Sequence, residues 1–196
     1  MLPFRRSDRL EKSVFRGGQI VTEFEEVAPA FSFPALPAGT VDVWTADSAV
    51  RVSPVLLPNE RARRIDIELA GAEAESVQLC VSTAEDVVPE VIDVSVGKLV
   101  SADGTAFSGK VKVERVGWFA RRGDSLRNPY SADDRELWFA EPILPIDGFT
   151  SVSGGTQCAW LTFTAARGAK SGIYSGTATV KVGGRNPIAV PVQIRV

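Results

Sequence analysis

Histidine is missing from this sequence, although the chain has 196 residues. Without an imidazole, the chain cannot form a Ser–His–Asp triad, a Cys–His pair or a metal site with a histidine ligand. Methionine occurs once and cysteine twice, at Cys80 and Cys158. Neither cysteine belongs to a CxxC motif, and two thiols cannot hold zinc by themselves. Two alternatives remain for them, buried free thiols or a bridge between paired strands.

Long apolar runs are missing as well. No stretch approaches the roughly 18 apolar residues of a membrane helix, so we expect no membrane span. The formal charge is −2, and basic residues are scattered along the chain except in two short clusters, at 5–16 and 61–64. This scatter predicts no nucleic-acid partner. No apolar stretch follows the first basic residues, which predicts no secretory signal, and without a glycine-rich phosphate motif we expect no cofactor.

The residues that are present favour β-structure. Valine is abundant, and the turn formers glycine and proline occupy 17 and 12 positions. Without intervening helices, the apolar runs predict an all-β fold: a two-sheet antiparallel β-sandwich, immunoglobulin-like or jelly-roll-like, over residues 41–196. The predicted strands are 41–44, 64–69, 76–81, 92–96, 110–119, 158–163, 177–182 and 188–196. Three of them, 64–69, 92–96 and 188–196, alternate strictly between apolar and polar residues.

Residues 1–40 differ in composition from the rest and predict an extended N-terminal arm. The arm holds half of the ten phenylalanines and ends in a proline-rich stretch, 27–39, which favours extended chain. The phenyl rings either lie across the sandwich or dock on a partner outside this chain. We expect the first, because apolar side chains ordinarily bury against their own chain.

A long loop at 120–145 is the candidate functional segment, because loops of this length are usually functional or disordered and this one carries aromatic residues. Trp118, Tyr130 and Trp138 bracket its polar residues and are candidates for a platform under a sugar ring. Packing in the core is the alternative for Trp118 and Trp138. Core packing is what we expect of the other two tryptophans, Trp44 and Trp160.

Charged residues of the loop complete this candidate substrate-binding set. Arg121, Asp133 and Asp134 are the candidate partners of sugar hydroxyls, although the two acids also have arginines nearby with which to pair. Neighbouring acids on one loop do not place two carboxylates on opposite sides of a glycosidic bond. We therefore predict no catalytic residue and no metal ligand. In the run before the loop the apolar phase slips after Val113, which predicts a β-bulge that re-aims Trp118.

Several segments together resemble the N-terminal β-sandwich of bacterial proteins related to the glycoside hydrolase 123 family. The similarity covers residues 41–196 and rests on the order and spacing of the segments. In chain order they are Ala70-Gly-Ala-Glu-Ala-Glu-Ser-Val-Gln-Leu79, Val111-Lys-Val-Glu-Arg-Val-Gly-Trp118, Glu141-Pro-Ile-Leu-Pro145, Ala159-Trp-Leu-Thr-Phe163 and Ser171-Gly-Ile-Tyr-Ser-Gly-Thr-Ala-Thr-Val180.

The resemblance implies a non-catalytic accessory domain that packs on a catalytic barrel of the same polypeptide and contacts glycan with the 120–145 loop. In the family, an adjacent acid pair acts with the acetamido group of N-acetylgalactosamine glycosides, and that pair lies in the barrel, so no catalytic residue carries over to this chain. An extracellular or periplasmic location is also implied. Two alternatives stay open: a stand-alone carbohydrate-binding module, and a structural or adhesion sandwich that self-associates.

Overall fold

The computed structural model describes residues 9–16, 19–26, 31–32, 36–52, 54, 57–58, 61–121 and 137–196. These ranges form β-strands joined by turns, and they include no helix long and apolar enough to cross a membrane. The strands are β1 (Arg9–Arg16), β2 (Gln19–Glu26), β3 (Phe31–Ser32), β4 (Val41–Asp47), β5 (Leu57–Pro58), β6 (Ile65–Glu68), β7 (Ala74–Thr83), β8 (Ile92–Val96), β9 (Val100–Ser101), β10 (Gly109–Arg121), β11 (Leu137–Pro145), β12 (Thr156–Ala165), β13 (Ile173–Val182) and β14 (Ile188–Arg195).

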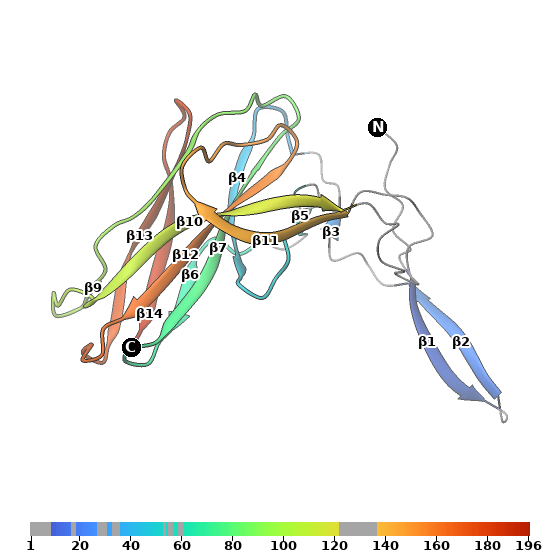
Figure 1. Ribbon diagram of the computed structural model, residues 1–196, viewed down its shortest axis with the longest axis horizontal. Coiled ribbons are helices and arrows are strands. Elements are labelled where there is room, and N and C mark those ends of the chain that lie inside the picture. Colours follow the sequence, from blue (N-terminus) through green and yellow to red (C-terminus); the bar gives the residue numbers. More distant parts are fainter. Residues whose placement is uncertain are drawn as a thin grey trace.

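Two five-stranded sheets face each other (Figure 1). The first sheet has the order β11-β10-β12-β7-β4 and is antiparallel throughout. The second has the order β6-β14-β13-β8, with β9 also paired to β13. Its β6 and β14 run parallel, and its other pairs are antiparallel. The predicted all-β sandwich is confirmed, and each of the predicted strands overlaps an observed one.

The N-terminal region contributes two small strand pairs. β1 and β2 form a hairpin whose paired ends are Arg16 and Gln19, and β3 pairs with β5. Figure 1 draws the hairpin (blue) apart from the two sheets. The side chains of residues 1–35 lie outside the described residues, so the burial of the phenylalanine rings stays a prediction. So does the domain boundary at residue 40.

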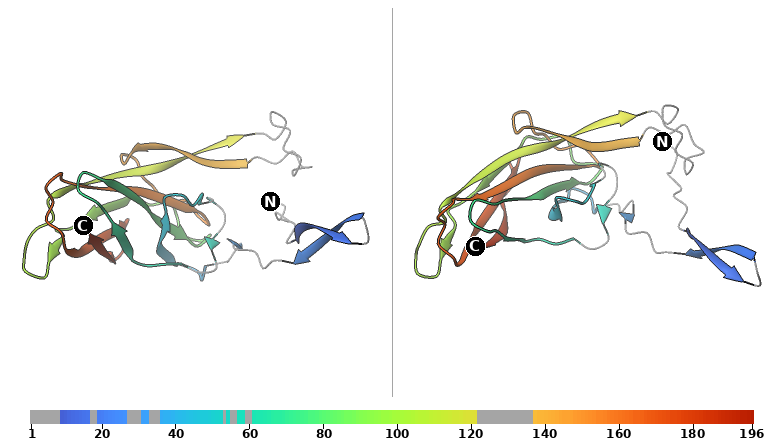
Figure 2. Two further views of the ribbon diagram at one scale, coloured as in Figure 1. Left: turned by 90° about the horizontal axis from the view of Figure 1, so that it is seen from below. Right: turned by 60° about the horizontal axis from the view of Figure 1, so that its bottom comes forward.

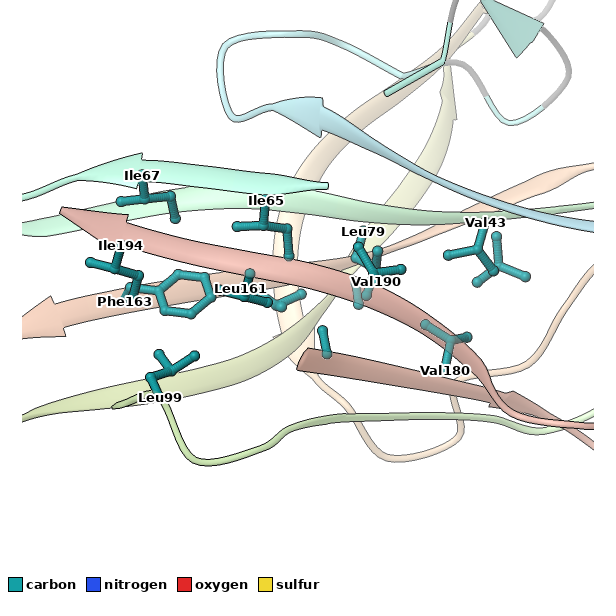
Figure 3. Packing of buried hydrophobic residues seen from close by; sticks show 14 of the residues in the cluster. Val43, Ile65, Ile67, Leu79, Leu99, Leu161, Phe163, Val180, Val190 and Ile194 are labelled. Atoms are coloured by element: carbon teal, nitrogen blue, oxygen red, sulfur yellow. The ribbon is translucent and has the colours of Figure 1, made fainter. Parts of the chain in front are cut away.

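The core lies between the sheets because each strand turns alternate residues inward. On β6 only the isoleucines, Ile65 and Ile67, are buried, while the acids between and after them are exposed. The first sheet contributes Leu79, Leu161 and Phe163, all fully buried. Figure 3 shows these side chains pointing into the space between the sheets. Burying both apolar faces against each other is what holds the sandwich together.

A glycine on β13 lets the chain before β9 pass close to the second sheet. A Cβ added at Gly176 would lie 2.6 Å from Leu99 Cδ2 and 2.7 Å from the Lys98 carbonyl oxygen. Leu99 is itself buried in the core. The backbone at Lys98 cannot yield without moving Leu99, so only glycine fits at position 176.

We expect Gly176→Ala to lower the free energy of unfolding by about 1–3 kcal/mol, the usual cost of overpacking a filled site. The measurement is the midpoint of urea unfolding. Gly168→Ala is the matched control, because nothing lies within 4 Å of the Cβ position of that turn glycine. Equal midpoints for the two variants would show that the Leu99 segment moves aside freely.

Candidate functional site

The first sheet also carries apolar side chains on its outer face, the face turned away from the second sheet. A row of them crosses all five strands. Register pairs Ile143 with Val116, Cys158 with Cys80, and Cys80 with Trp44, and Val116 and Cys158 share one buried cluster. The members of this outer cluster are Trp44, Val52, Cys80, Val116 and Cys158, with Leu36, Ala46, Trp118 and Trp160 packed against them.

The outer cluster explains the phase slip on β10. Val111 and Val113 pack against the core between the sheets, whereas Val116 and Trp118 pack in the outer cluster. The pairing of β10 with β12 is unbroken from Gly109 to Arg115, so the phase slip after Val113 is not itself a bulge, and the register shift of the run lies further along, between Val116 and Trp118. The strand keeps its period of two, and its apolar residues change from one face of the sheet to the other.

Buried polar side chains on the outer face are hydrogen-bonded to other side chains or to backbone carbonyl groups. The Trp44 indole N–H donates to Ser82 Oγ at 2.9 Å, and the Ser82 and Thr156 hydroxyls lie 2.8 Å apart. Gln78, which is 2% exposed, donates from Nε2 to the carbonyl oxygens of Asp47 at 2.9 Å and Val50 at 2.7 Å. The amide of Gln78 therefore ties the turn after β4 to the sheet.

A buried carboxylate fixes the next stretch of chain. Asp42 lies 2.7 Å from Arg61 Nε and 2.9 Å from Arg63 Nη2, and its side chain is 8% exposed. The amide N–H of Thr45 donates to the Ala62 carbonyl oxygen at 2.8 Å. A buried acid paired with two guanidinium groups has a structural role. It anchors residues 61–64 along the edge of β4.

The two thiols occupy the middle of the outer row. Cys80 and Cys158 are fully buried and free. Burial raises the pKa of the Cys80 thiol well above its usual range, and a hydrogen bond with Cys158 raises that pKa further. Of the two alternatives from the sequence, the structure shows free buried thiols, and it places them on paired strands.

The loop that carries the candidate residues begins and ends on a two-stranded ribbon. β12 pairs with β10 only as far as Arg115, and from Val116 onward β10 pairs with β11 alone. Figure 2 shows this ribbon reaching past the rest of the sandwich. Val116 opposes Ile143 and Trp118 opposes Ala140, so β11 has one extra residue between these pairs. A bulge therefore exists, on β11 and not on β10.

The bulge depends on a proline facing a glycine. Pro142 has no N–H group, so at its own position the bulge costs the ladder no donor. A Cβ added at Gly117 would lie 2.7 Å from Pro142 Cγ and 2.8 Å from Leu144 Cδ1. The bulge fits because Pro142 of β11 has no N–H group to pair and Gly117 of β10 has no side chain in the way.

The structure brings two of the candidate positions together on this ribbon. Trp118 is half-buried, packs on the outer cluster and donates from Nε1 to Gln157 Oε1 at 3.3 Å. Trp138 pairs with Ala120, so its position shares a face with Trp118. Arg121, which pairs with Leu137, falls on the opposite face. The remaining candidates, Tyr130, Asp133 and Asp134, lie outside the described residues.

The core packing expected of Trp44 is confirmed, but sequence reasoning did not show that Trp44 and Trp160 belong to a cluster on the outer face. Trp44 is buried there, and Trp160 is half-buried beside it. The signal was the unbroken apolar run at 158–161, since a run without alternation is typical of a strand covered on both faces. Within the described ranges, no group of three or more His, Cys, Asp or Glu could hold a metal ion.

The architecture is that of a β-sandwich domain, and it was compared with known proteins by sequence and by structure. No family model and no curated protein matches the sequence. A family 123 glycoside hydrolase from Clostridium perfringens, whose structure addresses glycolipid glycan hydrolysis, matches with a TM-score of 0.64 at 12% identity. The match covers 80% of this chain and 27% of the hydrolase chain. This chain therefore has the fold of part of that enzyme and spans about a quarter of its length.

Two further structures match less closely. Self-complemented MyfA, the major subunit of Myf fimbriae from Yersinia enterocolitica, was solved in complex with galactose. It has a TM-score of 0.33 at 17% identity, covering 80% of this chain and 99% of that chain. The CupB6 tip adhesin from Pseudomonas aeruginosa has a TM-score of 0.33 at 13% identity, with 68% and 40% covered. At such scores neither protein supports a functional argument.

We expect Gln78→Leu to lower the free energy of unfolding by about 1–3 kcal/mol, because two carbonyl oxygens lose their donor. Trypsin should also cleave faster after Arg51, in the turn that Gln78 holds. Urea unfolding and a digestion time course measure the two effects. Gln193→Leu on β14 is the control, since Gln193 is exposed. An unchanged digestion rate would mean that the turn is held by other contacts.

Proposed function

We propose that this chain is a non-catalytic β-sandwich accessory domain of a bacterial glycoside hydrolase-like protein, packed on a catalytic barrel of the same polypeptide. One observation carries the proposal. Four fifths of the chain has the fold of part of a family 123 glycoside hydrolase, yet the match takes up 27% of the enzyme's length. A domain of this size leaves most of such an enzyme to other parts of the polypeptide.

Two acids of the first sheet support a non-catalytic role. Asp42 is buried but held by two arginines, and Glu114 is paired with Lys112 at 2.8 Å. A glycosidase needs two carboxyl groups facing each other across a sugar, one of them with a raised pKa. Acids engaged with cations on one sheet do not supply that arrangement.

The ribbon supplies the second element of the proposal, contact with glycan. Trp118 and the position of Trp138 share one face of the ribbon, and Trp118 keeps part of its surface open. Aromatic faces pack against the C–H faces of sugar rings, while nearby polar groups bind the hydroxyls. In the accessory domain this face borders the substrate cleft of the barrel.

The reading frame around this chain tests the accessory part directly. We expect it to encode a catalytic barrel, and we expect deletion of residues 41–196 from that parent protein to lower both its glycosidase activity and its thermal midpoint. The parent carrying Gln193→Leu, an exposed change, is the control. A reading frame that encodes no barrel would refute the accessory role. So would a barrel that is equally stable and active after the deletion.

The stand-alone carbohydrate-binding module is the second candidate, and the shared face of Trp118 and Trp138 favours it. A glycan array of the isolated chain should then give a hit, and Trp118→Ala should weaken that binding by roughly tenfold, the loss expected for one stacking ring. Trp138→Ala should act alike, whereas Trp44→Phe, at a buried ring, should leave affinity unchanged. Absence of any array signal would count against the module.

A further inference from the structure

The two cysteines face each other at the centre of the first sheet. Register pairs Cys80 of β7 directly with Cys158 of β12. Both side chains are fully buried within the outer cluster. They come from parts of the sequence that are far apart, so only the fold brings them together.

The hydrogen-bonding pattern shows which kind of strand pair they occupy. Thr83 N–H donates to the opposite Gly155 carbonyl oxygen at 3.0 Å, and Ala165 N–H donates to that of Glu73 at 2.9 Å. Hydrogen-bonded and non-hydrogen-bonded pairs alternate along an antiparallel ladder. Odd positions of β7 are therefore hydrogen-bonded pairs, and Cys80 lies in a non-hydrogen-bonded one. Cα atoms of such pairs lie about 4.5 Å apart, within the range of roughly 4.4–6.8 Å for disulfides.

Neighbouring pairs of the same kind confirm how closely side chains meet here. The hydroxyls of Ser82 and Thr156 lie 2.8 Å apart, and those of Ser76 and Thr162 lie 3.0 Å apart. The Cys80 thiol is likewise hydrogen-bonded to Cys158. The two cysteines occupy directly paired positions on one face of the sheet, so a bond between them requires no change of register.

We propose that Cys80 and Cys158 form an intramolecular disulfide by exchange with a disulfide reagent such as oxidised glutathione. A thiolate of one cysteine attacks the reagent's S–S bond, which breaks and releases one glutathione as a thiolate. The other cysteine, as a thiolate, then attacks the mixed disulfide and releases the second glutathione. The protein loses two protons and two electrons, and both pass to the two glutathione thiols.

Access decides when the bond forms. Complete burial keeps the reagent away from both sulfur atoms, and the raised pKa of Cys80 keeps its thiol protonated. Exchange therefore takes place while β7 and β12 are pairing, and it is slow once the sheet has closed. In an oxidising compartment the chain acquires the bond as it folds, and in a reducing one it keeps two thiols.

The test uses the whole chain, unfolded in guanidinium and then refolded by dilution with oxidised and reduced glutathione. We expect a monomer without free thiols, and a peptide containing Cys80 joined to one containing Cys158 in a non-reducing mass map. The thermal midpoint should rise by roughly 10 °C over the reduced chain, since the link closes a long loop in the unfolded state. Reagent added to the folded chain should react far more slowly.

A second thiol pair separates geometry from access. In a Cys80→Ala, Cys158→Ala background, Ser76→Cys with Thr162→Cys places thiols in another non-hydrogen-bonded pair of the same strands. Both positions are half-buried, so this pair should oxidise in the folded chain. Two free thiols after refolding of the natural chain, linkage between chains instead of within one, or a lowered midpoint would each overturn the proposal.

Discussion

The structure depends on one sheet being covered on both faces. β7 and β12, at the middle of the first sheet, turn Leu79 and Leu161 toward the second sheet and Cys80 and Cys158 toward the outside, and all four are fully buried. A sheet that is apolar on both sides is stable in water only if something lies over each side. The second sheet covers the inner face. Part of the outer face is covered by Leu36 and Val52, which lie before and after β4. Side chains of the sheet hold the turn after β4 in place.

The polar side chains under the outer face serve that second cover. Gln78 holds the turn after β4 by two carbonyl groups, and Asp42 holds residues 61–64 by two arginines. In each case the protein partners take the place of the water molecules that the buried amide or carboxylate lost on folding. Val52 then lies almost completely buried in the outer cluster. Buried polar residues on the sheet thus hold loop segments against its outer face.

Alternation made β6, β8 and β14 of the second sheet predictable, because one face of each meets water. The run 64–69 alternates without fault, and in β6 it buries Ile65 and Ile67 alone. Two features of the fold were out of reach. The parallel pairing of β6 with β14 joins segments far apart in the chain, and no local pattern encodes it. The slip on β10 suggested a bulge because alternation alone cannot tell a bulge from a change of face.

The candidate site was predictable in part for the same reason. The spacing of Trp118 and Trp138 at the two ends of a loop indicated that they meet, and the register puts them on one face. Arg121 falls on the other face because neighbouring residues of a strand point to opposite sides. The hairpin of β1 and β2 also had a signal, two glycines between the paired ends Arg16 and Gln19, which is typical of a tight turn.

Two of the segments that resemble family 123 hydrolases contain residues with structural roles. In the first, the carboxylate of Glu73 accepts from the Ala70 N–H at 2.6 Å and closes a turn. In the last, the Tyr174 hydroxyl donates to the Lys170 carbonyl oxygen at 2.7 Å. Such residues fix turns and loops of a sandwich that shares its fold with part of the hydrolase at 12% identity. Contacts of this kind hold the sandwich together, and a fold shared at this level carries no function by itself.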